Sequence, residues 1–155
     1  SLGELGPRAR LILTGRPTPE VTVLKELAAW LNITEEVVYT GHVPVEHLPQ
    51  FYGAANVFAY PSLYEGFGMP PLEAMACGTP TIVSHAGALP EVVGNGAWQI
   101  DPYDAKEFAK AIIEVILNPK TATGLSQKGR EWVKRYSWSK VVKETILTYQ
   151  KILDG

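Results

Sequence analysis

Two glutamates on either side of a glycine-containing stretch form the part of the sequence best suited to chemistry. Glu65 directly precedes Gly66 and Gly68, and Glu73 follows the Pro70-Pro71 pair. Glycines let a backbone approach a ligand closely, and N–H groups at a helix N-terminus bind phosphate or sugar hydroxyls. Carboxylates accept paired hydrogen bonds from vicinal hydroxyls. The segment therefore favours a sugar that carries phosphate as its ligand.

The same residue types also fit a purely structural role. Glu73 could stabilise the N-terminus of its own helix, which is worth about 0.3–1 kcal/mol. Gly66 and Gly68 could serve a tight turn, and the nearby aromatic side chains could be core rather than sugar-stacking residues. Both interpretations stay open at the level of this segment alone.

The elements around this segment alternate between short apolar, β-branched runs and longer amphipathic ones. The short runs do not alternate apolar with polar residues, which is typical of strands covered on both faces. Alternation of strand and helix predicts a parallel sheet with right-handed crossovers. The expected strands are 10–14, 37–40, 57–60, 81–84 and 97–100.

Helices are expected between these strands and beyond the last of them. Leu24 to Leu31 mark one helix face, and Pro70-Pro71 begins a short helix that Gly78 ends. Asp104 with Glu107 resembles a capping box at the start of a further helix. Two more helices follow it, and we expect their apolar stripes to pack against the sheet and each other. No repeat or linker divides the chain, so residues 1–155 are predicted to form one domain.

Composition narrows the classes of function. The chain has 14 basic and 16 acidic residues among 155, a net charge of −2, which disfavours nucleic-acid binding. One cysteine excludes a disulfide scaffold, and the three histidines show no metal-ligand spacing. No apolar run reaches the roughly 18–20 residues that cross a bilayer, and no signal peptide is evident. We expect a cytoplasmic protein without a metal or cofactor.

The string EGFGMPPLEAMACGTP, residues 65–80, resembles the E-x7-E motif of the family 4 retaining glycosyltransferases, which have the GT-B fold. The resemblance covers nearly the entire chain and extends to four further segments, namely 13–15, 38–43, 86–93 and 136–138. It implies the C-terminal, donor-binding half of such an enzyme. That half is a Rossmann-like parallel sheet flanked by helices, with extra C-terminal helices.

The resemblance also implies residue roles. Glu73 would hold the ribose hydroxyls of a nucleotide, and Glu65 would face the donor hexose and is the expected catalytic residue. The residues expected around the donor sugar and diphosphate are Gly66, Phe67, Gly68 and Met69. Those expected on the nucleotide side are Gly15, Arg16, Gly41, His42 and Val43. Arg16 could equally be a solvated loop charge.

The implied reaction moves a glycosyl group from a nucleotide-diphosphate sugar to an acceptor hydroxyl, with retention at the anomeric carbon. Preorganised N–H groups and cations would stabilise the charge that develops on the departing diphosphate. Asp101 and Asp104 do not have the Asp-x-Asp spacing of a metal motif, so we expect a metal-independent site. Three alternatives stay open: a nucleotide-sugar-binding module without turnover, a phosphorylase, and a nucleotide-sugar epimerase. The lysine context that a phosphorylase needs is not found.

Three parts of the family pattern are not found in the sequence. In the relatives, a first strand and a basic Arg and Lys pair precede the strand at 10–14. Residues 1–7 contain no basic residue here, and Arg8 lies at the wrong place. The N-terminal, acceptor-binding domain is absent too. We therefore expect the chain to bind better than it catalyses, to show a gap or rearrangement in its sheet, and to expose an apolar cleft face open to self-association.

Overall fold

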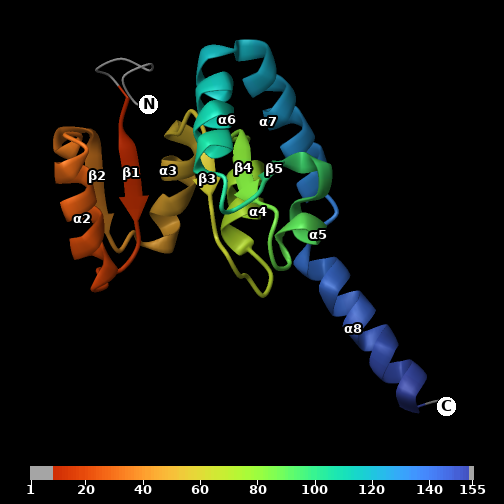
Figure 1. Ribbon diagram of the computed structural model, residues 1–155. Coiled ribbons are helices and arrows are strands. Elements are labelled where there is room, and N and C mark those ends of the chain that lie inside the picture. The colour runs from red at the N-terminus through yellow and green to blue at the C-terminus, as the bar shows by residue number, and fades with distance from the viewer. Residues whose placement is uncertain (1–8, 154–155) are drawn as a thin grey trace.

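The computed structural model describes residues 9–153 and shows parallel strands flanked by helices (Figure 1). Strand and helix alternate as far as β5, and only helices follow. The elements are β1 (Leu11–Thr14), α2 (Glu20–Trp30), β2 (Val37–Gly41), α3 (Leu48–Ala54), β3 (Phe58–Tyr60), α4 (Met69–Ala76), β4 (Thr81–Ser84), α5 (Leu89–Val93), β5 (Trp98–Ile100), α6 (Ala105–Leu117), α7 (Pro119–Val133) and α8 (Trp138–Leu153). Short 3-10 turns cover Thr34–Glu36, Val45–His47 and Gly94–Gly96. The expected parallel α/β fold is confirmed.

The strands form two sheets instead of one. β1 pairs only with β2, with Leu11 opposite Val37, and the second sheet has the order β3-β4-β5. All pairs are parallel, so the C-terminal ends of the strands in each sheet share one edge. Within the described residues, the sheet is thus parted between β1 and β3. The missing first strand itself would precede residue 9 and lies outside the described part.

The core surrounds the central strand of the larger sheet. All four residues of β4 are buried, and neighbouring residues of a strand point to opposite faces. Val83 packs in one apolar cluster with Met75 and Leu89, from α4 and α5. Ile82 packs in a second cluster with Phe108, from α6. Helices therefore cover both faces of this sheet, as the lack of apolar/polar alternation in its strands predicts.

The smaller sheet is much less buried. From residue 9 to residue 67, Ala28 is the only residue of the described chain that is buried. Leu11 and Ile12 of β1 are 43% and 45% exposed, although they are aliphatic residues in a strand. Apolar residues of α2, such as Trp30, are exposed as well. The N-terminal unit of β1, α2 and β2 therefore contributes little to the core.

The final helix departs from its sequence-based expectation. α6 and α7 begin at the caps Asp104 and Asn118 and pack on the core, as expected. α8 instead extends away from the rest of the molecule, and every one of its residues is exposed (Figure 1). The prediction that it packs against the sheet is therefore wrong. Its apolar stripe meets no partner surface within residues 9–153, because the helix leaves the body directly after α7.

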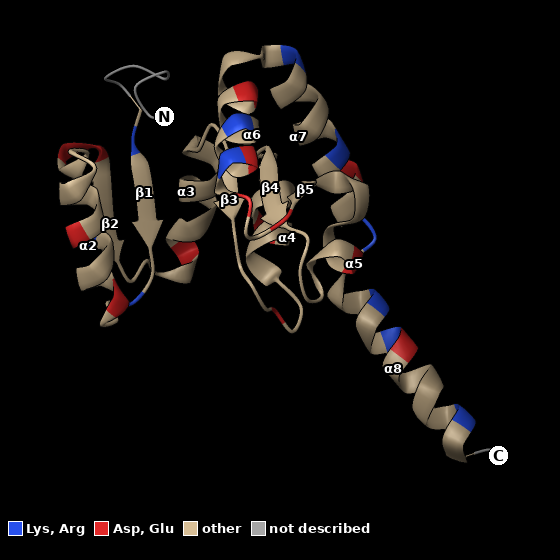
Figure 2. Ribbon diagram, viewed as in Figure 1, with Lys and Arg blue, Asp and Glu red and all other residues tan. Residues whose placement is uncertain are grey.

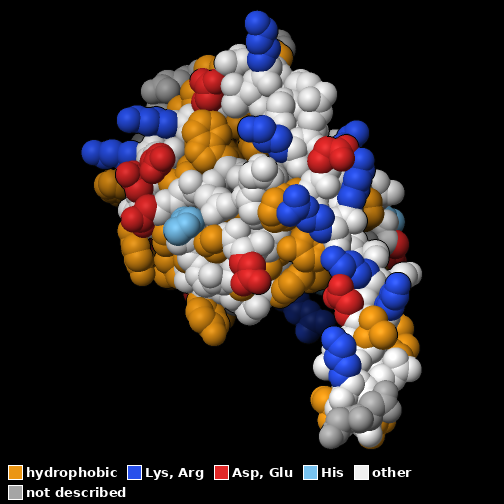
Figure 3. All heavy atoms as spheres, turned by 90° about the vertical axis from the view of Figure 1, so that its right-hand side faces the viewer, with side chains coloured by type: hydrophobic (Ala, Val, Ile, Leu, Met, Phe, Trp, Pro, Cys, Tyr) orange, Lys and Arg blue, Asp and Glu red, His pale blue; other side chains and the backbone are white. Residues whose placement is uncertain are grey.

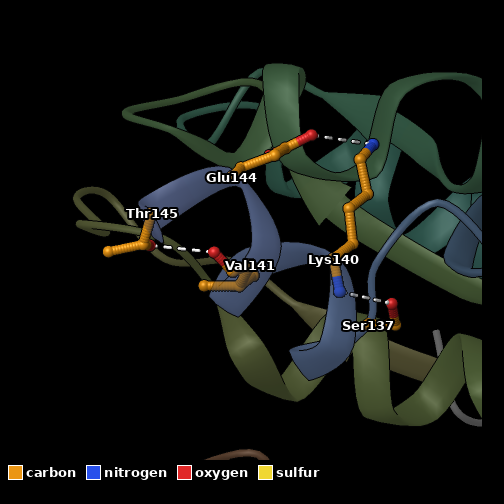
Figure 4. Close-up of polar contacts among 5 residues, drawn as sticks. All are labelled: Ser137, Lys140, Val141, Glu144 and Thr145. Atoms are coloured by element: carbon orange, nitrogen blue, oxygen red, sulfur yellow. Dashed lines mark hydrogen bonds and ion pairs between the residues drawn. The ribbon is translucent and has the colours of Figure 1, made fainter. Parts of the chain in front are cut away.

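α8 carries charged side chains and a few local side-chain hydrogen bonds. Three Lys residues and one Glu lie along it, and the space-filling view shows Lys and apolar side chains on the protruding helix (Figures 2 and 3). Ser137 Oγ accepts from the Lys140 amide at 3.2 Å, and Lys140 lies 3.9 Å from Glu144 (Figure 4). Thr145 donates to the Val141 carbonyl over 2.8 Å. None of the described helices is long and apolar enough to cross a bilayer.

Candidate functional site

The loop between β3 and α4 carries the first glutamate to the N-terminus of α4. Gly68 is the N-cap residue with φ at 93°, in the left-handed region, and Pro70 follows in the first turn. A Cβ at Gly68 would lie 2.5 Å from Leu89 Cδ2, so a side chain there would collide with α5. A glycine is therefore required on two grounds, conformation and space. The loop lies at the C-terminal end of a parallel strand, where open α/β sheets bind ligands.

Glu65 is held on one side of its carboxylate. Its Oε1 accepts from the Tyr60 hydroxyl at 2.6 Å and from Ser62 Oγ at 3.0 Å. Its Oε2 accepts no hydrogen bond from the described residues. The backbone of Glu65 is fixed as well, because the Ala88 amide donates to its carbonyl at 3.3 Å and a Cβ at Gly87 would lie 3.0 Å from its nitrogen. One carboxylate oxygen is thus left for a ligand.

The loop is also tied to β4 and to the C-terminal helices. Ser84, at the end of β4, donates to the carbonyl of Ser62. The ring of Phe67 contacts the ring of Tyr136, which follows α7. The loop therefore has contacts on both sides of Glu65, and its backbone is positioned before any ligand arrives.

Glu73 is held in the same manner from another element. It lies on α4, and its Oε2 accepts from the hydroxyl of Tyr52 on α3 at 2.9 Å. The backbone of Tyr52 is anchored in turn, since Thr79 Oγ1 donates to its carbonyl at 2.6 Å. Oε1 of Glu73 accepts no hydrogen bond from the part of the chain that is described.

The two tyrosine hydroxyls are shifted toward their protonated form. Burial and the neighbouring Glu65 carboxylate raise the pKa of Tyr60 to about 12. Burial and the hydrogen bond to Glu73 raise the pKa of Tyr52 even further. Both effects disfavour a phenolate, because a second negative charge would form in a partly desolvated place beside a carboxylate. At neutral pH both tyrosines are therefore hydrogen-bond donors.

The residues predicted on the nucleotide side form a second group at the ends of β1 and β2. The Gly15 amide donates to the Gly41 carbonyl at 3.0 Å, and both glycines have positive φ. Arg16 and His42 are exposed, and Val43 is half-buried. β1 and β3 carry this group and the glutamate loop toward the same side of the molecule (Figure 1). The structure thus assembles two groups, one on each sheet.

The sequence alone did not identify Tyr52 and Tyr60 as partners of the glutamates. Tyr52 matched an apolar helix face, and Tyr60 fitted core packing or stacking on a ligand. The available signal was the residue type, because a tyrosine at an apolar position carries a hydroxyl that needs a partner when buried. A separate hollow of about 490 Å³ lies at the ends of β4 and β5, lined by His85, Asp101 and Glu107 among others, and does not include either glutamate. No cluster of metal-ligating side chains occurs within residues 9–153.

Comparison with known proteins identifies the family of this chain. The sequence profile of the glycosyl transferases group 1 matches residues 1–132. The chain belongs to this family. Among curated group 1 relatives, the O-antigen chain mannosyltransferase B of Escherichia coli is 38% identical over 143 residues, which is 92% of this chain and 38% of that protein. The MMP alpha-(1->4)-mannosyltransferase of Mycolicibacterium hassiacum is 37% identical over 133 residues, or 83% of this chain and 32% of that protein.

Solved structures agree with this group 1 assignment and with the GT-B fold. Sucrose-phosphate synthase from Thermosynechococcus elongatus superposes with a TM-score of 0.87 at 32% identity, covering 97% of this chain and 40% of that chain. The C-terminal domain of a group 1 protein, LpcC from Francisella tularensis, superposes with a TM-score of 0.75 at 25% identity, covering 85% of this chain and 71% of that one. This group 1 chain thus spans well under half of the curated relatives it matches, and its fold is that of a GT-B C-terminal domain.

Proposed function

We propose that this chain is the donor-binding domain of a retaining glycosyltransferase that uses a nucleotide-diphosphate sugar. The observation that carries the proposal is the pair Glu65 and Glu73, each fixed by a tyrosine and each with one oxygen that has no hydrogen-bond partner among residues 9–153. Glu65 precedes the N-terminus of α4 and Glu73 lies within this helix, and the positive end of the helix dipole favours negative charge there, although Pro70 and Pro71 carry no N–H. A nucleotide-diphosphate sugar has a matching order of groups. It carries vicinal hydroxyls on a ribose and on a hexose, with a diphosphate between the two sugars.

The proposed roles are those that the family resemblance implies. Glu73 accepts from the ribose hydroxyls, and Glu65 accepts from the donor hexose and is the proposed catalytic residue. The backbone of residues 66–69 contacts the diphosphate and sugar. When the bond between the anomeric carbon and the diphosphate breaks, the leaving group takes the electron pair of that bond, and the acceptor oxygen bonds to the carbon and passes its proton to the departing diphosphate. The helix dipole of α4 and the backbone N–H groups of the loop before it would stabilise that charge without reorganising.

The nucleotide side of the proposed site is formed by the ends of the smaller sheet. Gly15 and Gly41 leave their Cβ positions open, with no atom within 4 Å, so a ligand can approach the backbone there. We place the base beside Gly41, His42 and Val43. The diphosphate lies beside Gly15 and Arg16. In this arrangement one ligand bridges both sheets.

We further propose that the parted sheet receives a first strand between β1 and β3, and that an acceptor-binding domain completes the enzyme. Both strands have an unpaired edge within the described residues. Leu11 and Ile12 of β1 are exposed, as expected for a strand that lacks a neighbour. The curated relatives are more than twice as long as the matched segment. The unpaired edges of β1 and β3 should exchange their amide hydrogens quickly in this chain alone. Slow exchange there would contradict the proposed vacant strand position.

The proposed donor carries mannose. Two relatives at 38% and 37% identity are mannosyltransferases, and a relative from Mycolicibacterium smegmatis at 32% identity is described as GDP-mannose-dependent. The test is a thermal-shift panel of GDP-mannose, UDP-glucose and ADP-glucose. A ligand that binds only the folded state raises the midpoint of unfolding with its concentration. We expect GDP-mannose to give the largest rise. No rise with any of the three would overturn nucleotide-sugar binding.

Turnover distinguishes the enzyme from its alternatives. An assay of free mannose and of mannosyl transfer reports whether this chain only binds its donor. Rates at the buffer level would favour a binding module. Acceleration by inorganic phosphate would instead indicate a phosphorylase.

A further inference from the structure

Tyr52 and Tyr60 act on the two glutamates in the same way from different elements. Each hydroxyl donates to one carboxylate oxygen, at 2.9 Å for Glu73 and 2.6 Å for Glu65. We propose that these tyrosines are a linked pair of positioning residues: Tyr52 fixes the carboxylate for the nucleotide, and Tyr60 fixes the carboxylate for the donor sugar. This inference rests on the donor-binding function proposed above.

The two tyrosines are joined by a row of aromatic rings. The Tyr52 and Phe58 rings meet edge-on, with centroids 5.4 Å apart and planes at 85°. The Phe58 and Tyr60 rings stack, with centroids 5.8 Å apart and planes at 19°. Phe58 and Tyr60 are two residues apart on β3 and so share one face of the strand. The row therefore sets the position of one hydroxyl relative to the other.

Each hydrogen bond prepares its carboxylate for a ligand. A free glutamate side chain must give up rotational freedom when it accepts a hydrogen bond from a sugar hydroxyl. A glutamate already bonded through one oxygen has lost that freedom before the ligand arrives, which lowers the cost of binding. Because the tyrosines bond to Oε2 of Glu73 and Oε1 of Glu65, the other oxygen of each remains available.

If Tyr52 and Tyr60 served only to pack the core, their hydroxyls would not be needed. Tyr60 could keep its ring contact with Phe58 without its hydroxyl, and so could Tyr52. The hydroxyls are therefore not needed for the aromatic row. Their partners are the two glutamates that bracket the N-terminus of α4, and Ser62 adds a second bond to the oxygen that Tyr60 already holds. The substitutions Tyr52→Phe and Tyr60→Phe therefore remove the hydrogen bond to the glutamate and keep the aromatic ring.

The experiment measures the affinity of four proteins for GDP and for GDP-mannose by calorimetry. The proteins are the wild type, Tyr52→Phe, Tyr60→Phe and the control Tyr103→Phe, whose side chain is 83% exposed. We expect Tyr60→Phe to weaken GDP-mannose by about three- to tenfold and to leave GDP within twofold. We expect Tyr52→Phe to weaken both ligands by about the same three- to tenfold. The control should bind both like the wild type.

A double substitution tests whether each tyrosine acts through its glutamate. In a Glu65→Ala background, adding Tyr60→Phe should change the affinity for GDP-mannose by less than twofold, because no carboxylate is left to position. A further loss as large as in the wild-type background would overturn the positioning role, as would equal losses of GDP and GDP-mannose in Tyr60→Phe. Wild-type binding with unchanged affinities in both single variants would overturn this inference alone. A wild type that binds neither ligand, nor UDP and UDP-glucose, would overturn the proposed function and this inference with it.

Discussion

The ring of Tyr136 meets the ring of Phe67 edge-on, with centroids 5.9 Å apart and planes at 87°. The Tyr136 hydroxyl donates to the Val92 carbonyl at 2.9 Å, and Trp132 Nε1 donates to the same oxygen at 2.8 Å. One carbonyl on α5 therefore anchors both aromatic residues from the end of α7. Through Phe67, this anchor reaches the loop that carries Glu65.

This relationship predicts a graded effect at Tyr136. Tyr136→Ala removes the ring contact and a hydrogen bond, so the free energy of unfolding should fall by about 1–3 kcal/mol. Tyr136→Phe removes only the hydrogen bond, and the Val92 carbonyl keeps its bond from Trp132, so the loss should stay below about 1 kcal/mol. Urea denaturation measures both. Equal losses in the two variants would show that the ring contact contributes nothing.

The N-cap of α4 predicts a difference between two glycines of one loop. Gly68→Ala should destabilise the fold by about 1–3 kcal/mol, since φ is 93° and the new Cβ would collide with Leu89. Gly66→Ala is the matched control, because no atom lies within 4 Å of its Cβ position and its φ is not positive. Thermal unfolding of both variants checks this. If Gly66→Ala is the more damaging change, the N-cap geometry is not the cause.

Removal of Glu73 should weaken binding of the nucleotide itself. Glu73→Ala deletes the acceptor for the ribose hydroxyls, and we expect a loss of about 1–3 kcal/mol in the binding of GDP. Calorimetry of GDP with the wild type and the variant measures it. Unchanged affinity for GDP would remove Glu73 from the proposed site.

Removal of Glu65 should act selectively on the sugar. Glu65→Ala is expected to weaken GDP-mannose by about 1–3 kcal/mol while leaving GDP nearly unaffected, since only the donor hexose contacts this carboxylate. The same calorimetric pair of ligands measures the difference. Comparable losses for both ligands would contradict the division of roles between the two glutamates.

The raised pKa values of Tyr52 and Tyr60 predict a dependence on alkaline pH. The pKa of Tyr60 is about 12 in the folded state against about 10 for a free phenol. A pKa raised by folding adds stability that is fully present below pH 10 and is lost as the pH rises toward 12. Absorbance at the tyrosinate band should show two late phenols among the seven, and each Tyr→Phe variant should remove one. A wild-type titration with no late phenol would contradict both hydrogen bonds.

The sequence was sufficient for the parts of the fold that depend on local pattern. The run Thr81–Ser84, which does not alternate apolar with polar residues, predicts a strand covered on both faces, and the Asp104 cap predicts the start of α6. Both are confirmed. The glycine-containing loop leading into α4 was predicted from Gly66, Gly68 and the prolines, and it lies where expected.

Contacts between distant segments could not be predicted in the same way. Tyr52 and Glu73 lie 21 residues apart, and only the packing of α3 on α4 brings them together. The amphipathic pattern of α8 indicated that one face is apolar but not what covers it, so packing on the sheet was the wrong conclusion. The roles of the individual site residues remain predictions that the binding experiments test.

The parting of the sheet has a consequence for dynamics. Hydrogen exchange from β4 requires opening of the main core, whereas β1 and β2 rest on a unit with a single buried residue, Ala28, and can open at a smaller free-energy cost. A nucleotide that contacts both Gly15 and Glu73 would link the N-terminal unit of β1, α2 and β2 to the main core. Part of its binding free energy would order the less stable unit, so protection from exchange should increase most in β1 and β2.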